Sequence, residues 1–314
     1  MKAYVLNEAG PVENMILSEI KKPSIQANDV LVKTKAISIN PVDVKVRPDE
    51  AALSMILGTE ERPVILGWDI SGVVTEVGEA VRDFNVGDKV FGMVNFVGHG
   101  KAYAEYVAAP ADQLAVIPAG ISFEDAAATT LAALTALQVL TGRVNSGDRV
   151  LIHAGSGGVG HYAIQIAKRM GATVITTSSS KNREFCLSLG ADEHIDYRAQ
   201  KFEEILTDID FVLDGMGGDI LENSIKVVKS GGKIVSLPTH TFEAGLQATA
   251  DAAGVALEFV MVQSNGENMN TLAGMLKAGT LKPHVSVTFP FEKLQEAHLQ
   301  IESGRTVGKA IVTV

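Results

Sequence analysis

Hydrophobic and polar positions follow two different periods along this chain, and the period changes near residue 123. Before that point, short runs such as residues 29–36 and 70–77 alternate with a period of two and end at Gly, Pro, Asn or Asp, as strands do. Turn glycines recur between these runs, at Gly67, Gly72, Gly78, Gly87 and Gly92. The pattern predicts a small and strongly curved β-barrel.

Beyond residue 123 the pattern becomes helical, and strands then alternate with helices. Residues 123–141 are rich in Ala and Leu at helical spacing. Apolar runs alternate with amphipathic stretches from about residue 148 onward, at 149–154, 172–177, 210–214, 233–237 and 255–262. This alternation is typical of a parallel sheet with helices on both faces. Two helical stretches and a strand at 310–314 follow, and we expect that strand to return to the first domain.

These changes predict two domains within 314 residues. Residues 1–123 and 264–314 would form the β-rich domain. Residues 124–263 would form an α/β domain with a doubly wound parallel sheet.

A glycine-rich loop, His153-Ala-Gly-Ser-Gly-Gly-Val-Gly160, lies where the strand at 149–154 meets a helix. Gly155, Gly157 and Gly160 satisfy G-x-G-x-x-G in the strand–helix–strand context that this motif requires. Glycine permits a tight turn, close approach of the backbone to a pyrophosphate, and close packing of helix on strand. The free amides of the loop and the positive helix end then bind phosphates. The loop predicts a dinucleotide site.

The end of the second strand of this unit indicates which dinucleotide binds. An enzyme that prefers NAD usually has an Asp or Glu there, whereas residues 176–182 read Thr-Thr-Ser-Ser-Ser-Lys-Asn. Hydroxyls and a cation suit a 2′-phosphate, so NADPH is favoured over NADH. The expected groups are Ser178, Ser179, Lys181 and Tyr197, with Arg183 as a further candidate. Ser180 could also cap a helix beginning near Lys181, and both interpretations can hold together.

Composition narrows the class of protein. There are 27 basic and 37 acidic residues, a net charge of −10, which argues against nucleic acid or an anionic membrane as the main partner. No run of 18 apolar residues occurs and the first residues resemble a strand, so we expect a cytoplasmic protein. The single cysteine, Cys186, excludes internal disulfides and Cys-rich zinc sites, and we expect it to be packed in the core. The acid pairs Glu60–Glu61 and Glu203–Glu204 are expected to be solvated.

The order of motifs resembles the medium-chain dehydrogenase/reductase superfamily over the whole chain, and most of all its zinc-independent quinone oxidoreductases and enone reductases, the zeta-crystallin-like branch. The motifs that carry the resemblance, besides the glycine loop, are Asn40-Pro-Val-Asp43, Leu66-Gly-Trp-Asp-Ile-Ser-Gly-Val-Val74, Gly87-Asp-Lys-Val-Phe-Gly92, Tyr103-Ala-Glu-Tyr106, Ala126-Ala-Ala-Thr-Thr-Leu131, Leu189-Gly-Ala-Asp192, Ile195-Asp-Tyr197 and Gly304-Arg-Thr-Val-Gly-Lys309. The resemblance implies an α/β fold in which a Rossmann domain is joined to a β-rich, GroES-like partial barrel.

Departures from the zinc-dependent members predict the chemistry. Those members bind zinc through a Cys, a His-Glu pair and a second Cys or acid, whereas this chain has Asn40 and Trp68-Asp69 at the first positions. Without such ligands no zinc polarises an alcohol. We therefore expect no metal, and hydride transfer from NADPH to an activated acceptor such as a quinone or an α,β-unsaturated carbonyl.

The resemblance also implies roles for individual residues. Cofactor residues would be Asn40 and Thr130 near the nicotinamide, Gly155, Ser156, Gly157, Gly158, Val159 and Gly160 at the pyrophosphate, Gly215, Leu237 and Pro238 beside the ribose, Phe259, Val260 and Met261 at the carboxamide, and Lys309. The substrate space would lie between the domains and be lined by Trp68, Phe96 and His99. Many quinone reductases carry a tyrosine after the Asn-Pro segment, and this chain lacks it. Candidate catalytic groups are Asn40, Lys45 and Arg47, since either cation could stabilise a carbonyl oxygen that gains charge. Asp43 fits a turn residue better than an acid, and His153 a packed residue.

The resemblance further implies a homodimer. Two other functions remain open: a cofactor-binding sensor or structural protein with little turnover, and RNA binding, which the net charge opposes.

Overall fold

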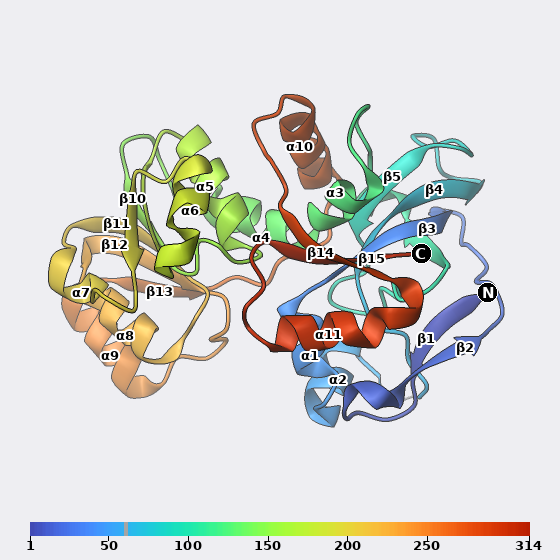
Figure 1. The fold of residues 1–314 in the computed structure, drawn as a ribbon, viewed down its shortest axis with the longest axis horizontal. Helices are drawn as coiled ribbons and strands as arrows, with labels where there is room; N and C mark the ends of the chain where they lie inside the picture. Colours follow the sequence, from blue (N-terminus) through green and yellow to red (C-terminus); the bar gives the residue numbers. More distant parts are fainter. Residues whose placement is uncertain (60–61) are drawn as a thin grey trace. The chain divides into compact units, whose positions relative to one another are not determined.

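The computed structural model describes residues 1–59 and 62–314, so the acid pair Glu60–Glu61 lies outside the described residues. The chain divides into two compact units (Figure 1). Unit 1 comprises Met1–Leu134 and Val262–Val314, and unit 2 comprises Thr135–Met261. No helix within the described residues is long and apolar enough to cross a membrane.

Unit 1 is built on a seven-stranded sheet in the order β14-β15-β3-β4-β5-β7, with β6 paired to β3. Its strands are β3 (Asp29–Ile39), β4 (Asp69–Val77), β5 (Lys89–Met93), β6 (Tyr106–Pro110), β7 (Ala115–Val116), β14 (Val285–Pro290) and β15 (Lys309–Thr313). The antiparallel strands β1 (Lys2–Leu6) and β2 (Met15–Glu19) form a separate pair. β15 runs antiparallel to β3, so the strand at the end of the sequence returns to the first domain as predicted. Register shifts between β3 and β4 are the kind of irregularity that bends a sheet.

The helices of unit 1 flank this sheet. They are α1 (Pro41–Val46), α2 (Glu50–Leu57), α3 (Phe123–Ala128), α10 (Gly266–Lys277) and α11 (Leu294–Glu302), with 3-10 turns at Val12–Asn14, Ala111–Gln113 and Phe291–Lys293. The expected domain boundary after residue 123 differs from the observed one because α3 packs on β3, β4 and β15. The observed boundary falls within α4 (Leu131–Leu140). α11 packs against α1 and β15 (Figure 1).

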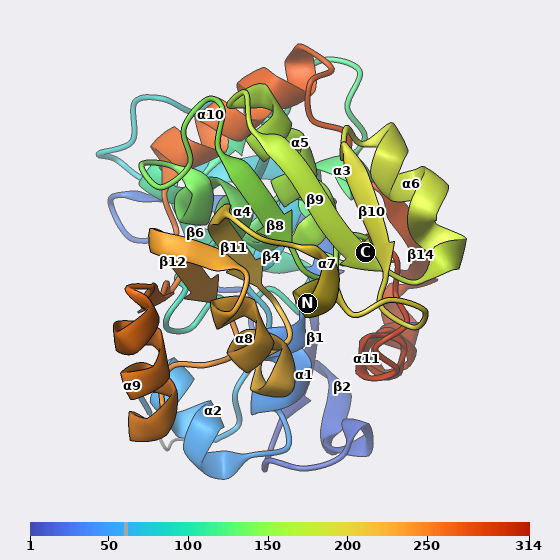
Figure 2. The ribbon, with the colours of Figure 1, turned by 90° about the vertical axis from the view of Figure 1, so that its left-hand side faces the viewer.

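Unit 2 contains a six-stranded parallel sheet in the order β10-β9-β8-β11-β12-β13 (Figure 2). Its strands are β8 (Arg149–Ile152), β9 (Thr173–Ser178), β10 (Glu193–Asp196), β11 (Ile209–Asp214), β12 (Val228–Ser236) and β13 (Ala256–Phe259). Counted within the unit this order is 3-2-1-4-5-6, the doubly wound order of dinucleotide-binding domains. The predicted Rossmann sheet is therefore confirmed, and its strand order reverses at β8.

The helices of unit 2 connect these strands. They are α5 (Gly160–Arg169), α6 (Arg183–Ser188), α7 (Phe202–Ile205), α8 (Gly218–Ile225) and α9 (Ala244–Ala253), with a 3-10 turn at Ser180–Asn182. Two local expectations differ from the structure. Ser180 caps no helix, since the 3-10 turn precedes α6. Residues 160–167 of α5 are all buried, whereas the amphipathic stretches expected after residue 148 predict a helix with one solvated face.

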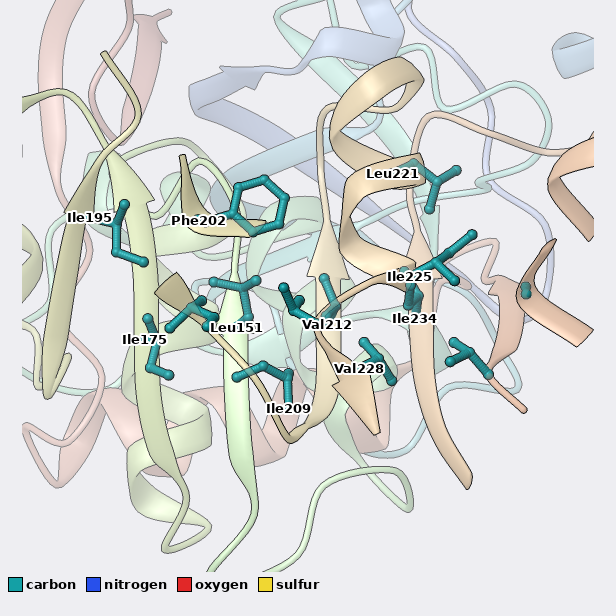
Figure 3. Packing of buried hydrophobic residues seen from close by; sticks show 14 residues of the cluster. Leu151, Ile175, Ile195, Phe202, Ile209, Val212, Leu221, Ile225, Val228 and Ile234 are labelled. Carbon is teal, nitrogen blue, oxygen red and sulfur yellow. The ribbon is translucent and has the colours of Figure 1, made fainter. Parts of the chain in front are cut away.

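An apolar layer holds the sheet of unit 2 against its helices (Figure 3). Leu151, Val212 and Ile234 lie on three neighbouring strands and pack with Leu221 and Ile225 of α8. Burial of each such side chain contributes about 1.5–3 kcal/mol. This packing fixes the end of β8, and with it the loop that follows.

Candidate active site

The glycine loop follows β8, the strand at which the strand order of the sheet reverses. β9 lies on one side of β8 and β11 on the other. Ala154 has a positive φ of 52°. The amide of Gly155 donates to the carbonyl of Thr177 at 3.0 Å, and the amide of Gly157 donates to the carbonyl of Ala154 at 2.8 Å. The tight turn predicted from the sequence is therefore present at the carboxyl end of the strands, where such sheets bind ligands.

Close packing explains two of the three glycines. A Cβ atom at Gly155 would lie 1.9 Å from Oγ1 of Thr176, and one at Gly160 would lie 2.3 Å from the carbonyl oxygen of Ala154. At Gly157 the nearest atom would be 3.1 Å away, which is tight but not prohibitive. The strand and the start of α5 therefore approach more closely than a side chain would allow.

The loop presents backbone donors at the start of a helix. The amides of Ser156, Gly158 and Val159 make no hydrogen bond to any other described residue. They precede α5, whose N-terminal end is positive. Asn182 donates to Oγ of Ser156 at 2.9 Å and so links the loop to the segment after β9. Unpaired amides beside two glycines that exclude a Cβ fit the pyrophosphate of a dinucleotide.

The segment after β9 divides into buried and exposed side chains. Ser178 and Ser179 are buried, and Oγ of Ser178 contacts Nε2 of His194 at 2.7 Å and Sγ of Cys186 at 3.6 Å. The hydroxyl of Ser178 is therefore engaged inside the unit, which argues against the predicted contact with a 2′-phosphate. Lys181 is exposed and remains a candidate. Burial confirms the prediction that Cys186 is a packed thiol.

Tyr197 follows β10 and is 56% exposed, with the guanidinium of Arg198 over its ring. Its hydroxyl is close enough to accept a hydrogen bond from Nε of Arg198 at 3.3 Å. The structure thus leaves it accessible.

The loops after β11 and β12 meet around Asp214. Its carboxylate accepts hydrogen bonds from the amides of Met216 and Gly217 and from Oγ of Ser236. The amide of Leu237 donates to the carbonyl of Asp214 at 2.8 Å. These bonds hold the three residues predicted to lie beside the ribose at the carboxyl ends of β11 and β12: Gly215, Leu237 and Pro238. The predicted carboxamide residues Phe259, Val260 and Met261 end and follow β13, the neighbouring strand.

His153 is a packed residue, as predicted. Its ring lies 3.0 Å from Oγ1 of Thr177 and 3.0 Å from Oγ of Ser224. Burial lowers its pKa to about 4, so the ring is neutral near pH 7.

Unit 1 contains a buried group of charged and amide side chains, which we call the Asn40 cluster: Asn40, Asp43, Asp69 and Lys309. The amide nitrogen of Asn40 donates to Oδ2 of Asp69 at 2.8 Å, and its amide oxygen accepts from Nζ of Lys309. The carboxylate of Asp43 accepts from the backbone N–H of Asn40 at 2.6 Å. The four residues are almost completely buried. Asn40, at the N-cap of α1, therefore joins an anion to a cation.

Burial shifts the pKa of each charged member of the cluster. Burial raises the pKa of Asp69, and the charge of Lys309 and the amide of Asn40 oppose that rise. Burial raises the pKa of Asp43 to about 7, with Asp69 adding to the rise and Lys309 opposing it. Burial lowers the pKa of Lys309, and the two carboxylates oppose this. The segment that contains Thr130 adjoins the cluster, because the amide of Leu131 donates to Oδ1 of Asp69 at 3.0 Å.

The donors of the Asn40 cluster do not fit zinc. Zinc sites use Cys, His and carboxylate ligands, and a catalytic site keeps one coordination position open. Here an ammonium group already lies against the amide oxygen of Asn40. No group of three or more His, Cys, Asp or Glu side chains suited to a metal occurs in residues 1–59 and 62–314.

The structure changes the interpretation of the two candidate catalytic cations. Lys45 is exposed on α1. Arg47 is only 4% exposed: its Nε donates to the carbonyl of Gly10 at 2.9 Å, and its Nη1 lies 2.8 Å from Glu302 and 3.2 Å from Nδ1 of His298. The hypothesis that Arg47 directly stabilises a substrate oxygen is therefore wrong, because its donors are engaged inside unit 1.

The three residues predicted to line the substrate space differ in burial. Trp68 is completely buried, donates from Nε1 to the carbonyl of Gly98 at 2.8 Å and packs edge-on against Phe96. It cannot line an open space, so it supports Phe96 instead. His99 lines a cavity of about 240 Å³ in unit 1, together with Thr59, Pro63, Val64, Ile65 and Lys101.

Comparisons with known proteins agree with this geometry. Residues 26–119 match the family described as alcohol dehydrogenase GroES-like domain, and residues 189–312 match the family described as zinc-binding dehydrogenase. A 2-methylene-furan-3-one reductase of Solanum lycopersicum is 36% identical, over 99% of this chain and 79% of the relative. The chain belongs to the medium-chain dehydrogenase/reductase superfamily.

Two further members of the superfamily are similar over nearly the whole chain. A chloroplastic NADPH-dependent alkenal/one oxidoreductase of Arabidopsis thaliana is 34% identical, over 99% of this chain and 79% of the relative. The solved quinone oxidoreductase from Coxiella burnetii is 38% identical with a TM-score of 0.93, covering 100% of this chain and 99% of that one.

Sequence reasoning missed three buried residues: Asp69 as a hydrogen-bond partner, Tyr103 and His298. Asp69 is a charged residue inside the apolar motif Leu66–Val74, and that was a usable signal, whereas the motif Tyr103–Tyr106 carries no comparable signal for Tyr103. His298 had no signal, because Glu296 and Gln300 lie two positions before and after it and make it one of several polar residues of its helix.

Proposed function

We propose that this protein is a zinc-independent, NADPH-dependent reductase that transfers hydride to quinones or α,β-unsaturated carbonyl compounds. The observation that carries the proposal is the Asn40 cluster, in which Nζ of Lys309 donates to the amide oxygen of Asn40, the residue that stands where the zinc-dependent members have their first ligand. A site of this kind offers no Lewis acid for oxidising a simple alcohol. It suits an acceptor that provides its own electron sink.

The enzyme class follows from the family, since the relatives are named as reductases and oxidoreductases and the chain shares their fold. The protein is an oxidoreductase. These names support turnover over a role limited to binding a cofactor.

Three features support NADPH as the cofactor. The relative of Arabidopsis thaliana is named as NADPH-dependent. The amides of Ser156, Gly158 and Val159 are available to a pyrophosphate, and Lys181, in the segment after β9, is exposed and available to a 2′-phosphate. When bound, NADPH supplies the hydride from its nicotinamide ring.

The acceptor takes up the electron pair of the hydride, and the protein positions the acceptor. In an enone, a C–H bond forms at the β-carbon and the electron pair of the alkene moves toward the carbonyl oxygen. The resulting enolate takes a proton from solvent or from a nearby donor, which gives the saturated carbonyl compound. The protein has to orient the acceptor and exclude water. Phe96, held by buried Trp68, and His99, in the cavity wall, are the unit 1 side chains that we assign to this role.

The direct test is stopped-flow oxidation of NADPH against a panel of quinones, enones and saturated alcohols. We expect turnover with quinones or enones and none with alcohols, before and after dialysis against a strong zinc chelator. Turnover of saturated alcohols alone, or loss of activity that only added zinc restores, would contradict the proposal. The cytoplasmic location stays a prediction.

A further inference from the structure

Three buried polar side chains lie end to end beside α1. Arg47 is at the C-terminal cap of α1, His298 is on α11, and Tyr103 precedes β6. Nη1 of Arg47 lies 3.2 Å from Nδ1 of His298, and Nε2 of the same ring lies 2.8 Å from the hydroxyl oxygen of Tyr103. His298 and Tyr103 are completely buried. Such groups are costly to bury unless each hydrogen bond is satisfied.

The chemistry of arginine sets the direction of these bonds. A guanidinium group only donates, so Nδ1 of His298 must accept. A neutral imidazole that accepts at Nδ1 carries its proton on Nε2, which therefore donates to the oxygen of Tyr103. Burial and the charge of Arg47 lower the pKa of His298 to about 3, so the ring is neutral at ordinary pH.

The hydroxyl proton of Tyr103 must then point toward another acceptor. The carboxylate of Asp43 faces it, and the Tyr103 hydroxyl lowers the pKa of that carboxyl group. Oδ2 of Asp43 already accepts from the backbone of Asn40. Oδ1 is buried and makes no hydrogen bond at ordinary distance to another described residue. Oδ1 of Asp43 is therefore available to accept a hydrogen bond from the Tyr103 hydroxyl.

We propose that Arg47, His298 and Tyr103 form a hydrogen-bond chain of fixed direction that ends on Asp43 and keeps Asn40 positioned for the reductase reaction. The proposal rests on the proposed function for the last step only. Arg47, His298 and Tyr103 are positioning residues, because each acts on the Asn40 cluster through its neighbour. Arginine does not release its proton, so the chain transmits orientation and charge and is not a proton wire.

The charges around Asp43 explain why its carboxylate needs this support. Asp69 on β4 repels the charged form, whereas Lys309 on β15 attracts it, and burial opposes it. The backbone N–H of Asn40 donates to the charged form, and the Tyr103 hydroxyl also favours that form, since it lowers the pKa of Asp43. Loss of the Tyr103 hydroxyl therefore leaves Asp43 protonated at a higher pH, and a protonated Asp43 holds Asn40 less firmly.

The backbone at Gly67 leaves room for the ring of Tyr103 in the hydrogen-bond chain. Gly67 has a φ of +86°, and a Cβ atom there would lie 2.4 Å from the ring of Tyr103. The Tyr103 ring also contacts His298 edge-on. The ring has little freedom to turn its hydroxyl away from Asp43.

The first experiment is ¹⁵N NMR of the histidine rings in the full chain, with His298 assigned by its loss in His298→Gln. We expect the neutral ring with its proton on Nε2 throughout pH 5 to 9. A proton on Nδ1, or titration to the imidazolium form within that range, would overturn the proposal. This readout needs no turnover, so it stands apart from the proposed function.

The second experiment compares the pH profiles of kcat/KM for NADPH with an accepted quinone or enone. Tyr103→Phe is expected to move the acidic limb upward by about one pH unit, because the carboxylate of Asp43 loses its donor. His298→Phe is expected to move it in the same direction by less, because Tyr103 keeps its hydroxyl but loses the donor that directs the hydroxyl proton toward Asp43. His298→Gln should stay near the wild type, since the amide of Gln can accept from Arg47 and donate to Tyr103.

Leu299→Ala is the matched control, because Leu299 lies next to His298 on α11 and is 51% exposed. An unmoved acidic limb in Tyr103→Phe, or an equal loss at every pH in all three variants, would reduce the chain to a structural role and overturn the proposal. Failure of the wild type to reduce any acceptor would instead contradict the proposed function. The NMR result would still show whether the hydrogen-bond chain has the proposed direction.

Discussion

The side-chain amide of Asn40 donates to Oδ2 of Asp69 at 2.8 Å and so joins the start of α1 to the first residue of β4. The amide oxygen accepts from Lys309. Rotation of the amide by 180° would place its NH₂ group against the ammonium and its oxygen against the carboxylate. The two charged neighbours therefore fix the orientation of Asn40.

Removal of the ammonium should be strongly destabilising. Lys309→Met leaves Asp69 and Asp43 buried without their cation, and breaking a buried pair in this way costs about 3–5 kcal/mol. Urea unfolding at pH 7.5 measures the loss in the free energy of unfolding. Lys45→Met is the control, since Lys45 is exposed on α1 and its loss should cost less than about 0.5 kcal/mol.

A double-mutant cycle tests whether that loss comes from the ion pair. The variant with both Asp69→Asn and Lys309→Met should lose less stability than the sum of the two single variants. Additive losses would show that the two side chains do not interact.

Gly160→Ala should abolish cofactor binding and lower stability. The added Cβ would lie 2.3 Å from the carbonyl oxygen of Ala154, so the loop would have to move away from α5. Fluorescence titration with NADPH and urea unfolding report the two effects. Gly245→Ala is the control, because Gly245 lies in α9 with open space around it and the change should be neutral or stabilising. Unchanged NADPH affinity in Gly160→Ala would remove the loop from the cofactor site.

Lys181→Ala should discriminate between the two pyridine nucleotides. Loss of a cation from a 2′-phosphate removes a charge-assisted hydrogen bond, so the KM for NADPH should rise about tenfold more than the KM for NADH. Steady-state kinetics with both cofactors measures this, with Lys201→Ala as a control at another exposed lysine of unit 2. Equal effects on both cofactors would remove Lys181 from the phosphate site.

Asp43 should make stability depend on pH in a predictable direction. Its pKa rises from 3.8 to about 7 in the folded protein, so the folded state binds more protons between these values. This contribution to stability is complete below pH 3.8 and is lost as the pH rises through about 7. The free energy of unfolding of the wild type should therefore fall relative to Asp43→Asn, by up to about 1.4 kcal/mol per pH unit.

Urea unfolding of both proteins at pH 5 and pH 8 measures the difference. His153 and His298 have lowered pKa values and act in the opposite direction, but they are present in both proteins and cancel in the comparison. A difference that does not change with pH would mean that Asp43 keeps an ordinary pKa.

The homodimer expected from the sequence can be checked by sedimentation. β10 and β13 are the edges of the sheet of unit 2, and an exposed edge can pair with another chain. Sedimentation velocity at micromolar concentration should give the mass of two chains. A monomer at the working concentration would contradict the prediction.

Local patterns were sufficient to predict the Rossmann sheet and the glycine loop. Each strand of unit 2 is an apolar run bounded by turn residues, and the loop glycines touch atoms only a few positions away or on the next strand, such as Thr176. The return of β15 to the first domain was also predicted, because a closing strand needs a partner.

The side-chain contacts of unit 1 could not be predicted in the same way. The partners of Asn40 come from residues 69 and 309, and their meeting depends on the registers of β4 and β15 against β3. Arg47 resembled an exposed cation because the sequence around it does not reveal that His298 and Gly10 cover it. Ser178 resembled a loop hydroxyl, but it ends β9 with its side chain turned inward.

The pairing of β15 with β3 has a consequence for biosynthesis. Lys309 and His298 are made long after Asn40, Arg47 and Tyr103, and unit 2 is synthesised in between. A nascent chain can therefore complete its nucleotide-binding sheet while the Asn40 cluster still lacks its lysine. During that interval Asp69 and Asp43 have no ammonium beside them. Their electrostatic interactions with Lys309 can form only after β15 has been synthesised and has paired with β3.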